Sequence, residues 1–151
     1  MGASTFSKPY IVLMGAVGSG KSTIVEKLTG VKGRSGADKF SVTTSSEVFQ
    51  NFDGSLDICD TPGTNARQDR FMHNMHVAHA LNARPVTCIL IVAKADTRIE
   101  NTVKTISEYL DTLLPDEFPT EVLGVCITHM DVVSWKKSDV MPIMEEDLDI
   151  K

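Results

Sequence analysis

The stretch Gly15-Ala16-Val17-Gly18-Ser19-Gly20-Lys21-Ser22 matches the pattern G-x4-G-K-[ST] at every fixed position. An apolar run without helical spacing, residues 10–14, precedes it, and a segment with helical spacing, residues 22–29, follows it. A glycine-rich loop between a strand and a helix turns successive backbone N–H groups toward phosphate oxygens. This stretch therefore predicts a nucleotide-binding α/β fold.

The side chains at the end of this loop are suited to a nucleotide bound with Mg²⁺. Lys21 would place its charge on the β- and γ-phosphates, and the hydroxyl of Ser22 would bind Mg²⁺. We expect nucleotide contacts from the whole loop, which comprises Gly15, Ala16, Val17, Gly18, Ser19, Gly20, Lys21, Ser22 and Thr23.

A second loop, Asp60-Thr61-Pro62-Gly63, which we call the DTPG loop, follows a strand-like run. The carboxylate of Asp60 is placed to hold Mg²⁺, usually through water, and the N–H of Gly63 is placed to meet a γ-phosphate. Many GTPases carry a glutamine directly after this loop, but here Thr64 occupies that position, and Gln68 is only a distant substitute. We therefore expect slow hydrolysis by a lone molecule.

A polar stretch before the predicted hairpin contains Thr43 and Thr44. We expect Thr43, ahead of Thr44, to close over Mg²⁺ when a γ-phosphate is present. The alternative is that both are ordinary β-branched strand residues.

Two tetrapeptides resemble a guanine-recognition motif that ends in Asp, which we call the reader. They are Ala93-Lys94-Ala95-Asp96 and Thr128-His129-Met130-Asp131. In a doubly wound sheet the reader follows the strand after the third helix, which favours Thr128, His129 and Asp131. The carboxylate of Asp131 would accept the N1–H and the exocyclic amine of guanine, whereas adenine lacks both donors in that arrangement. His129 would stack on the base, or would be an exposed loop residue.

The pattern of the chain predicts the order β-α-β-β-α-β-α-β, that is, a three-layer α/β/α fold with a mostly parallel sheet and one antiparallel hairpin strand. Asp53-Gly54 predicts the hairpin turn. A helix over residues 97–114 has apolar residues at helical spacing, and Thr97 with Glu100 predicts its capping box. Residues 132–151 show neither a strand nor a long helix in their pattern.

Composition limits the class of protein. The 151 residues, 42% of them hydrophobic, suit one globular domain. With 15 Lys and Arg against 20 Asp and Glu, the net charge of −5 argues against a nucleic-acid partner. The three cysteines, Cys59, Cys88 and Cys126, form no CxxC pair, which favours a reducing, cytoplasmic location.

Taken together, the phosphate loop, Ser41-Val42-Thr43, the DTPG loop and the Thr-His-x-Asp reader resemble the immunity-associated AIG-type (IAN) GTPases of the septin-like branch. The resemblance covers roughly residues 8–133, so we divide the chain into a leader (1–8), a guanine-nucleotide-binding domain (9–133) and a short acidic tail (134–151). It implies GTP or GDP with Mg²⁺, and homodimerisation or homo-oligomerisation through the nucleotide face. It also implies an effector or an internal membrane as a partner, and it makes Arg98 a candidate arginine finger.

The chain departs from that family after residue 131, because members continue through a sixth strand and a final helix. We therefore expect a domain that lacks its last strand and helix, in which the strand at residues 121–127 forms an exposed apolar edge. The best interpretation is a slow GTPase, with Lys21, Thr43, Gly63 and Arg98 as catalytic candidates. An assembly module with little hydrolysis is the main alternative, and an ATP-dependent small-molecule kinase is a weaker one.

Overall fold

The computed structural model describes residues 8–32, 45–63, 70–113 and 120–148. In chain order, its elements are β1 (Tyr10–Met14), α1 (Lys21–Thr29), β2 (Glu47–Gln50), β3 (Asp57–Asp60), α2 (Arg70–Asn82), β4 (Cys88–Lys94), α3 (Ile99–Leu113), β5 (Leu123–Thr128) and α4 (Lys137–Leu148). Two 3-10 turns, Thr120–Val122 and Met130–Val132, flank β5. The predicted order is confirmed as far as β5.

The five strands form one sheet in the order β2-β3-β1-β4-β5. Only the β2–β3 pair is antiparallel, so the predicted, mostly parallel sheet with one hairpin strand is confirmed. Leu13 pairs with Asp60, and Lys94 pairs with Thr128. Because these four strands are parallel, this register brings the loops after β1, β3, β4 and β5 to the same end of the sheet, where the strands finish.

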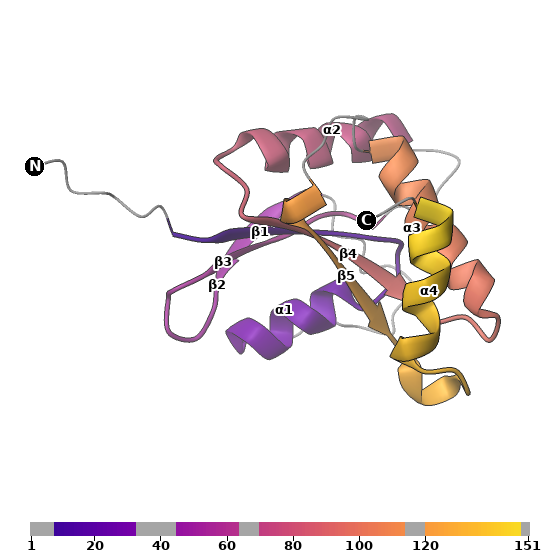
Figure 1. Cartoon of the computed structure of the whole chain (residues 1–151). Coiled ribbons are helices and arrows are strands. Elements are labelled where there is room, and N and C mark those ends of the chain that lie inside the picture. The colour runs from indigo at the N-terminus through magenta and orange to yellow at the C-terminus, as the bar shows by residue number, and fades with distance from the viewer. Residues whose placement is uncertain (1–7, 33–44, 64–69, 114–119, 149–151) are drawn as a thin grey trace, which may run out of the picture.

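Helices cover both faces of the sheet (Figure 1). On one face, Val25 of α1 packs with Leu13, Ile58 and Val92. The other face carries two clusters, one under α2 and one under α3 and α4. The α3–α4 cluster contains Ile91, Ala93, Val103, Ile106, Tyr109, Val140 and Met144. The expected three-layer architecture follows from this alternation of side chains along each strand.

Helix α4 corrects the expectation that no long helix follows residue 132. It packs on α3, and Val140 is only 2% exposed. Pro142 lies inside the helix, where it removes a backbone donor, so the sequence pattern looks unlike a helix. Its start is nevertheless well formed, because the carboxylate of Asp139 accepts the N–H of Lys136 at 2.8 Å.

Beyond β5, the described residues contain no further strand, and β5 is an edge strand. Its side chains are half-buried or exposed, with Val125 38% exposed. The structure thus agrees with the expected apolar edge. None of the described helices has both the length and the apolar character needed to span a membrane.

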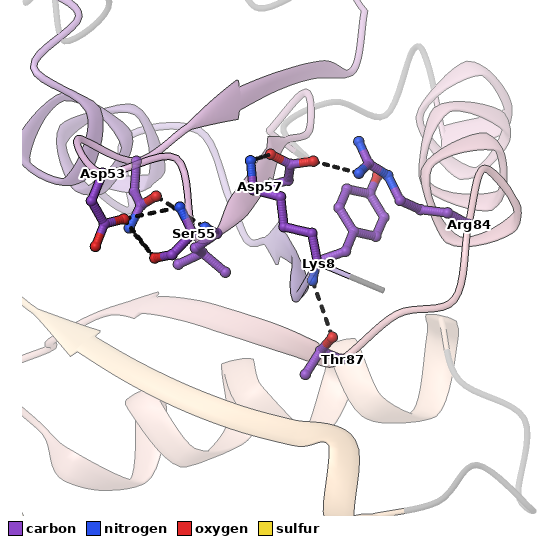
Figure 2. A network of polar contacts seen from close by, with 9 residues as sticks. Lys8, Asp53, Ser55, Asp57, Arg84 and Thr87 are labelled. Atoms are coloured by element: carbon purple, nitrogen blue, oxygen red, sulfur yellow. Dashed lines mark hydrogen bonds and ion pairs between the residues drawn. The ribbon is translucent and has the colours of Figure 1, made fainter. Parts of the chain in front are cut away.

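Polar contacts fix the hairpin and the end of the sheet at which β1 and β3 begin. Gly54 has φ +71°, and Asp53 accepts the N–H of Ser55 at 2.9 Å, so the predicted Asp-Gly turn is confirmed. Figure 2 shows the buried carboxylate of Asp57 between Lys8 and Arg84. The Lys8 ammonium, 2.5 Å away, holds the pKa of Asp57 below its ordinary value. These contacts join the starts of β1 and β3 to the loop before β4.

Candidate nucleotide site

The phosphate loop passes so close to β4 that its first residue must be glycine. A Cβ on Gly15 would lie 2.2 Å from the carbonyl oxygen of Val92. Gly20, at the start of α1, has φ +97°, a conformation that L side chains rarely adopt. The buried hydroxyl of Ser19 has no hydrogen-bond partner among the described residues. The sequence thus folds locally into the loop that its motif predicts.

Lys21 is buried within this loop. Its ammonium donates to the carbonyl oxygens of Gly15 and Ala16, both at 2.8 Å. Desolvation lowers the pKa of Lys21 from its ordinary 10.5 to about 8, and the nearby charge of Asp60 opposes this shift. A buried cation that binds only neutral carbonyl groups is well suited to an anionic ligand.

The first turn of α1 meets the end of β3 at a hydroxyl–carboxylate pair. The hydroxyl of Ser22 donates to Oδ2 of Asp60 at 3.1 Å, and Asp60 is 1% exposed. Both groups are oxygen ligands of the kind that Mg²⁺ prefers. Among the described residues, no group of three or more His, Cys, Asp or Glu side chains is arranged so that it could hold a metal ion by itself. A site of this kind would need oxygens from the ligand or from water to complete its coordination.

The DTPG loop is held by a residue that the sequence analysis did not single out. The buried hydroxyl of Thr61 donates to the carbonyl oxygen of Leu13 at 2.6 Å, which ties the loop to β1. Beyond it, a Cβ on Gly63 would lie 2.7 Å from the backbone nitrogen and Cα of Val17. The DTPG loop and the phosphate loop are therefore in direct contact, and only glycine fits at position 63.

The reader predicted at the end of β5 lies beside the phosphate loop. The hydroxyl of Thr128 donates to the carbonyl oxygen of Ser19 at 2.6 Å. His129 has a left-handed backbone with φ 57°, and Asp131 lies exposed in the 3-10 turn that follows. No described residue forms a hydrogen bond or ion pair with the carboxylate of Asp131. That carboxylate is therefore accessible to a ligand.

The competing tetrapeptide, Ala93–Asp96, has a different role. Oδ1 of Asp96 accepts the N–H of Arg98 at 2.9 Å and the amide of Asn101 at 3.1 Å. Asp96 thus orders the turn that leads into α3, and the hydroxyl of Thr97 also donates to Oδ1 of Asp96, at 3.5 Å, which corrects the predicted Thr97–Glu100 capping box. Because this carboxylate already has partners within the chain, Asp131 is the better placed of the two candidates.

Other predicted site residues are placed less completely. Arg98 lies exposed just before α3. Thr43, Thr64 and Gln68 lie outside the described residues. The structure therefore brings together the phosphate loop, Asp60, Gly63 and the Thr128–Asp131 turn, and leaves the proposed roles of Thr43 and Arg98 as predictions.

Known structures share this fold. NFeoB from S. thermophilus bound to GDP·AlF4⁻ and K⁺ has a TM-score of 0.59 at 21% identity, covering 82% of this chain and 45% of that one. The same protein bound to mGMPPNP has a TM-score of 0.56 at 19% identity, covering 82% and 44%. A GDP-bound single-residue variant has a TM-score of 0.56 at 23% identity, covering 83% and 45%. The chain thus spans less than half the length of these structures.

No curated protein sequence matches the chain. The family model described as 50S ribosome-binding GTPase, however, matches residues 10–123, which run from the start of β1 to the start of β5 and include both phosphate loops. This match covers well over half of the chain. The protein therefore belongs to this GTPase family.

Proposed function

We propose that the chain binds GTP and GDP with Mg²⁺ and hydrolyses GTP slowly to GDP and phosphate. This proposal rests on one observation. At one end of the sheet, the buried Lys21 ammonium, the Ser22–Asp60 pair and the Thr128–Asp131 turn lie on adjoining loops. These groups match, in order, the phosphates, the metal ion and the base of a guanine nucleotide.

In this proposal Lys21 leaves the loop carbonyl groups and binds the β- and γ-phosphates. Ser22 and Asp60, with Thr43, hold Mg²⁺, which neutralises phosphate charge when bound. The N–H of Gly63 binds the γ-phosphate. Because Gly63 lies against Val17 of the phosphate loop, the position of the DTPG loop depends on whether the γ-phosphate is present. Catalysis would come mostly from positioning, as is usual in phosphoryl transfer.

Slow turnover follows from what the second loop lacks. Thr64 occupies the position where many GTPases carry a water-orienting glutamine. We propose that the missing group is supplied by a second molecule, and that Arg98, exposed before α3, is the residue it contributes. The Thr-His-Met-Asp reader supports placement in the AIG-type branch, and that resemblance implies association at an internal membrane or with an effector. The three cysteines, none of them in a CxxC pair, support a cytoplasmic location.

The proposal is tested by titrating the protein with fluorescent GDP in the presence of Mg²⁺. Lys21→Met should weaken binding about 100-fold, because a buried cation that pairs with phosphate is worth about 2–5 kcal/mol. Lys27→Met is the matched control, since Lys27 is exposed six residues further along α1, and it should bind like the wild type. Equal affinity of the wild type and Lys21→Met would contradict the proposal.

A nucleotide-binding assembly module with little hydrolysis is the second candidate. The apolar edge strand β5 favours it, because Val125 is 38% exposed there and an unpaired edge promotes association. Phosphate release should be measured against protein concentration. A rate per molecule that rises with concentration supports catalysis by a partner copy, whereas association on GTP without phosphate release supports the assembly module.

A further inference from the structure

Trp135 joins the loop after β5 to the loop after β4. It is the only tryptophan of the chain. Its indole N–H donates to the carbonyl oxygen of Asp96 at 2.8 Å, and its half-buried ring packs against the α3–α4 cluster. The side chain therefore has both a specific hydrogen bond and a fixed packing position.

The segment with Asp131 is attached at both ends to that neighbouring loop. At its start, the carbonyl oxygen of Thr128 accepts the N–H of Ala95 at 2.9 Å. At its end, Trp135 binds the next residue, Asp96. Between these two attachments, the N–H of Val132 donates to the carbonyl oxygen of His129 at 3.3 Å and closes the turn.

The attachment point is itself rigid. The N–H of Asp96 donates to the hydroxyl of Thr102 at 2.9 Å, and Thr102 is 1% exposed within α3. The carboxylate of Asp96 also binds Arg98 and Asn101, as described above. Asp96 is therefore fixed by three groups of α3 and its start, and the bond from Trp135 transmits that fixed position to the turn.

We propose that Trp135 is a positioning residue for guanine recognition, and that its indole N–H sets the place of the Asp131 carboxylate. This inference rests on the proposed function. Asp131 is exposed and has no polar partner among the described residues, so its position depends on the backbone turn that Trp135 and Thr128 hold. Small displacements matter because the energy of a hydrogen bond depends steeply on distance and angle.

The test compares GDP with IDP. The base of IDP lacks only the exocyclic amine, from which Asp131 would accept a hydrogen bond. Trp135→Phe keeps an aromatic ring in the cluster and removes the N–H donor. We expect it to lower the preference for GDP over IDP by about tenfold, because the hydrogen bond between Asp131 and the exocyclic amine is weakened but not removed. In an Asp131→Ala background the same change should have no effect on this preference, because residues that act through each other are non-additive.

Val140→Ala is the control for packing, since Val140 lies in the same cluster and is 2% exposed but belongs to no loop of the site. It should lower stability to urea and leave the GDP preference unchanged. A wild-type preference in Trp135→Phe, or an equal loss in the Asp131→Ala background, would overturn the inference alone. Failure of the wild type to bind GDP would overturn the proposed function and this inference with it.

A measurement on the wild type covers the case in which Trp135→Phe does not fold. The single indole N–H resonance in an NMR spectrum should shift on addition of GDP, and by less on addition of IDP. An indole resonance that is unchanged by saturating GDP would overturn the inference.

Discussion

At the scale of single residues, Lys21 combines burial with a positive charge, and this has a consequence for stability. It is 6% exposed, and its ammonium is held by two backbone carbonyl groups. Desolvation puts its pKa at about 8 in the folded chain, against an ordinary value of 10.5. The ligand-free protein therefore holds a charged group at neutral pH in a place that disfavours the charge.

The first prediction concerns pH. Between pH 8 and 10.5 the unfolded chain keeps the Lys21 proton that the folded chain has lost, so the contribution of Lys21 to stability rises with pH across this window. The difference in unfolding free energy between the wild type and Lys21→Met should therefore grow in favour of the wild type there and stay flat below it. Urea unfolding followed by circular dichroism measures it, and a flat or falling difference would refute the prediction.

A second prediction concerns Gly63. Alanine at this position would bring its Cβ within 2.7 Å of the Val17 backbone, so the DTPG loop must move away from the phosphate loop. We expect Gly63→Ala to lose affinity for a non-hydrolysable GTP analogue by roughly tenfold or more relative to GDP, since a hydrogen bond to a charged group is worth about 1.5–3 kcal/mol. Dissociation constants for both ligands test this.

The double variant with Val17→Gly is the internal control for that prediction. It removes the Val17 side chain but keeps the nitrogen and Cα that an alanine at position 63 would meet. The double variant should therefore remain impaired. Full recovery of analogue binding would show that side-chain crowding, and not the approach of the two backbones, sets the geometry.

Several residue roles could be predicted from the sequence because they depend on local spacing alone. The glycines of residues 15–20 and the lysine after them form a motif with a backbone reason for each position. Thr61 and Trp135 could not be predicted in this way. Their partners, Leu13 and Asp96, lie 48 and 39 residues away, and only the register of the sheet brings them together.

At the scale of elements, the end of β5 is joined to the phosphate loop by one side chain. The hydroxyl of Thr128 reaches the carbonyl oxygen of Ser19, 109 residues earlier in the chain. The methyl group of Thr128 also lies against Gly20, where an added Cβ would approach it to 3.2 Å. The turn that contains Asp131 and the phosphate loop are thus positioned relative to each other by Thr128.

A third prediction follows for this contact. Thr128→Val keeps the shape of the side chain but leaves the Ser19 carbonyl without its donor, which should cost about 1–2 kcal/mol of stability and weaken GDP binding. Thr105→Val is the matched control, because its hydroxyl bonds only within α3, to Asn101. It should cost less than about 0.5 kcal/mol. Equal losses in the two variants, measured by urea unfolding, would contradict the role given to Thr128.

Helix α4 shows why one element was missed. The residues that α4 packs into the core, Val140, Ile143 and Met144, lie close together in the middle of the helix, and Pro142 interrupts the backbone bonding there. Helix formation here depends on packing against α3, which a local pattern does not reveal. By contrast, α3 was predicted within two residues of its bounds, because its apolar residues repeat at helical spacing over its whole length.

At the scale of the whole molecule, the order of strands decides which loops share an edge. The order β2-β3-β1-β4-β5 places both reader candidates at the end of the sheet that carries the phosphate loop, and chain order favours Thr128–Asp131, because β5 is the strand after the third helix. Chemistry supports the same choice, because the carboxylate of Asp96 accepts hydrogen bonds from Arg98 and Asn101, whereas the carboxylate of Asp131 has no polar partner among the described residues. The architecture and the preferred reader could be predicted from the sequence, whereas the hydrogen bonds that occupy the carboxylate of Asp96 could not.

The central claim, a guanine-nucleotide site read by Asp131, is tested most directly by a competition experiment on the wild type and Asp131→Asn. For the wild type, GDP and GTP should displace fluorescent GDP while ATP and XDP do not. In Asp131→Asn the amide offers a donor to the second carbonyl group of xanthine, so XDP should compete better than GDP. Equal competition by ATP in the wild type, or an unchanged order of GDP and XDP in the variant, would contradict the account.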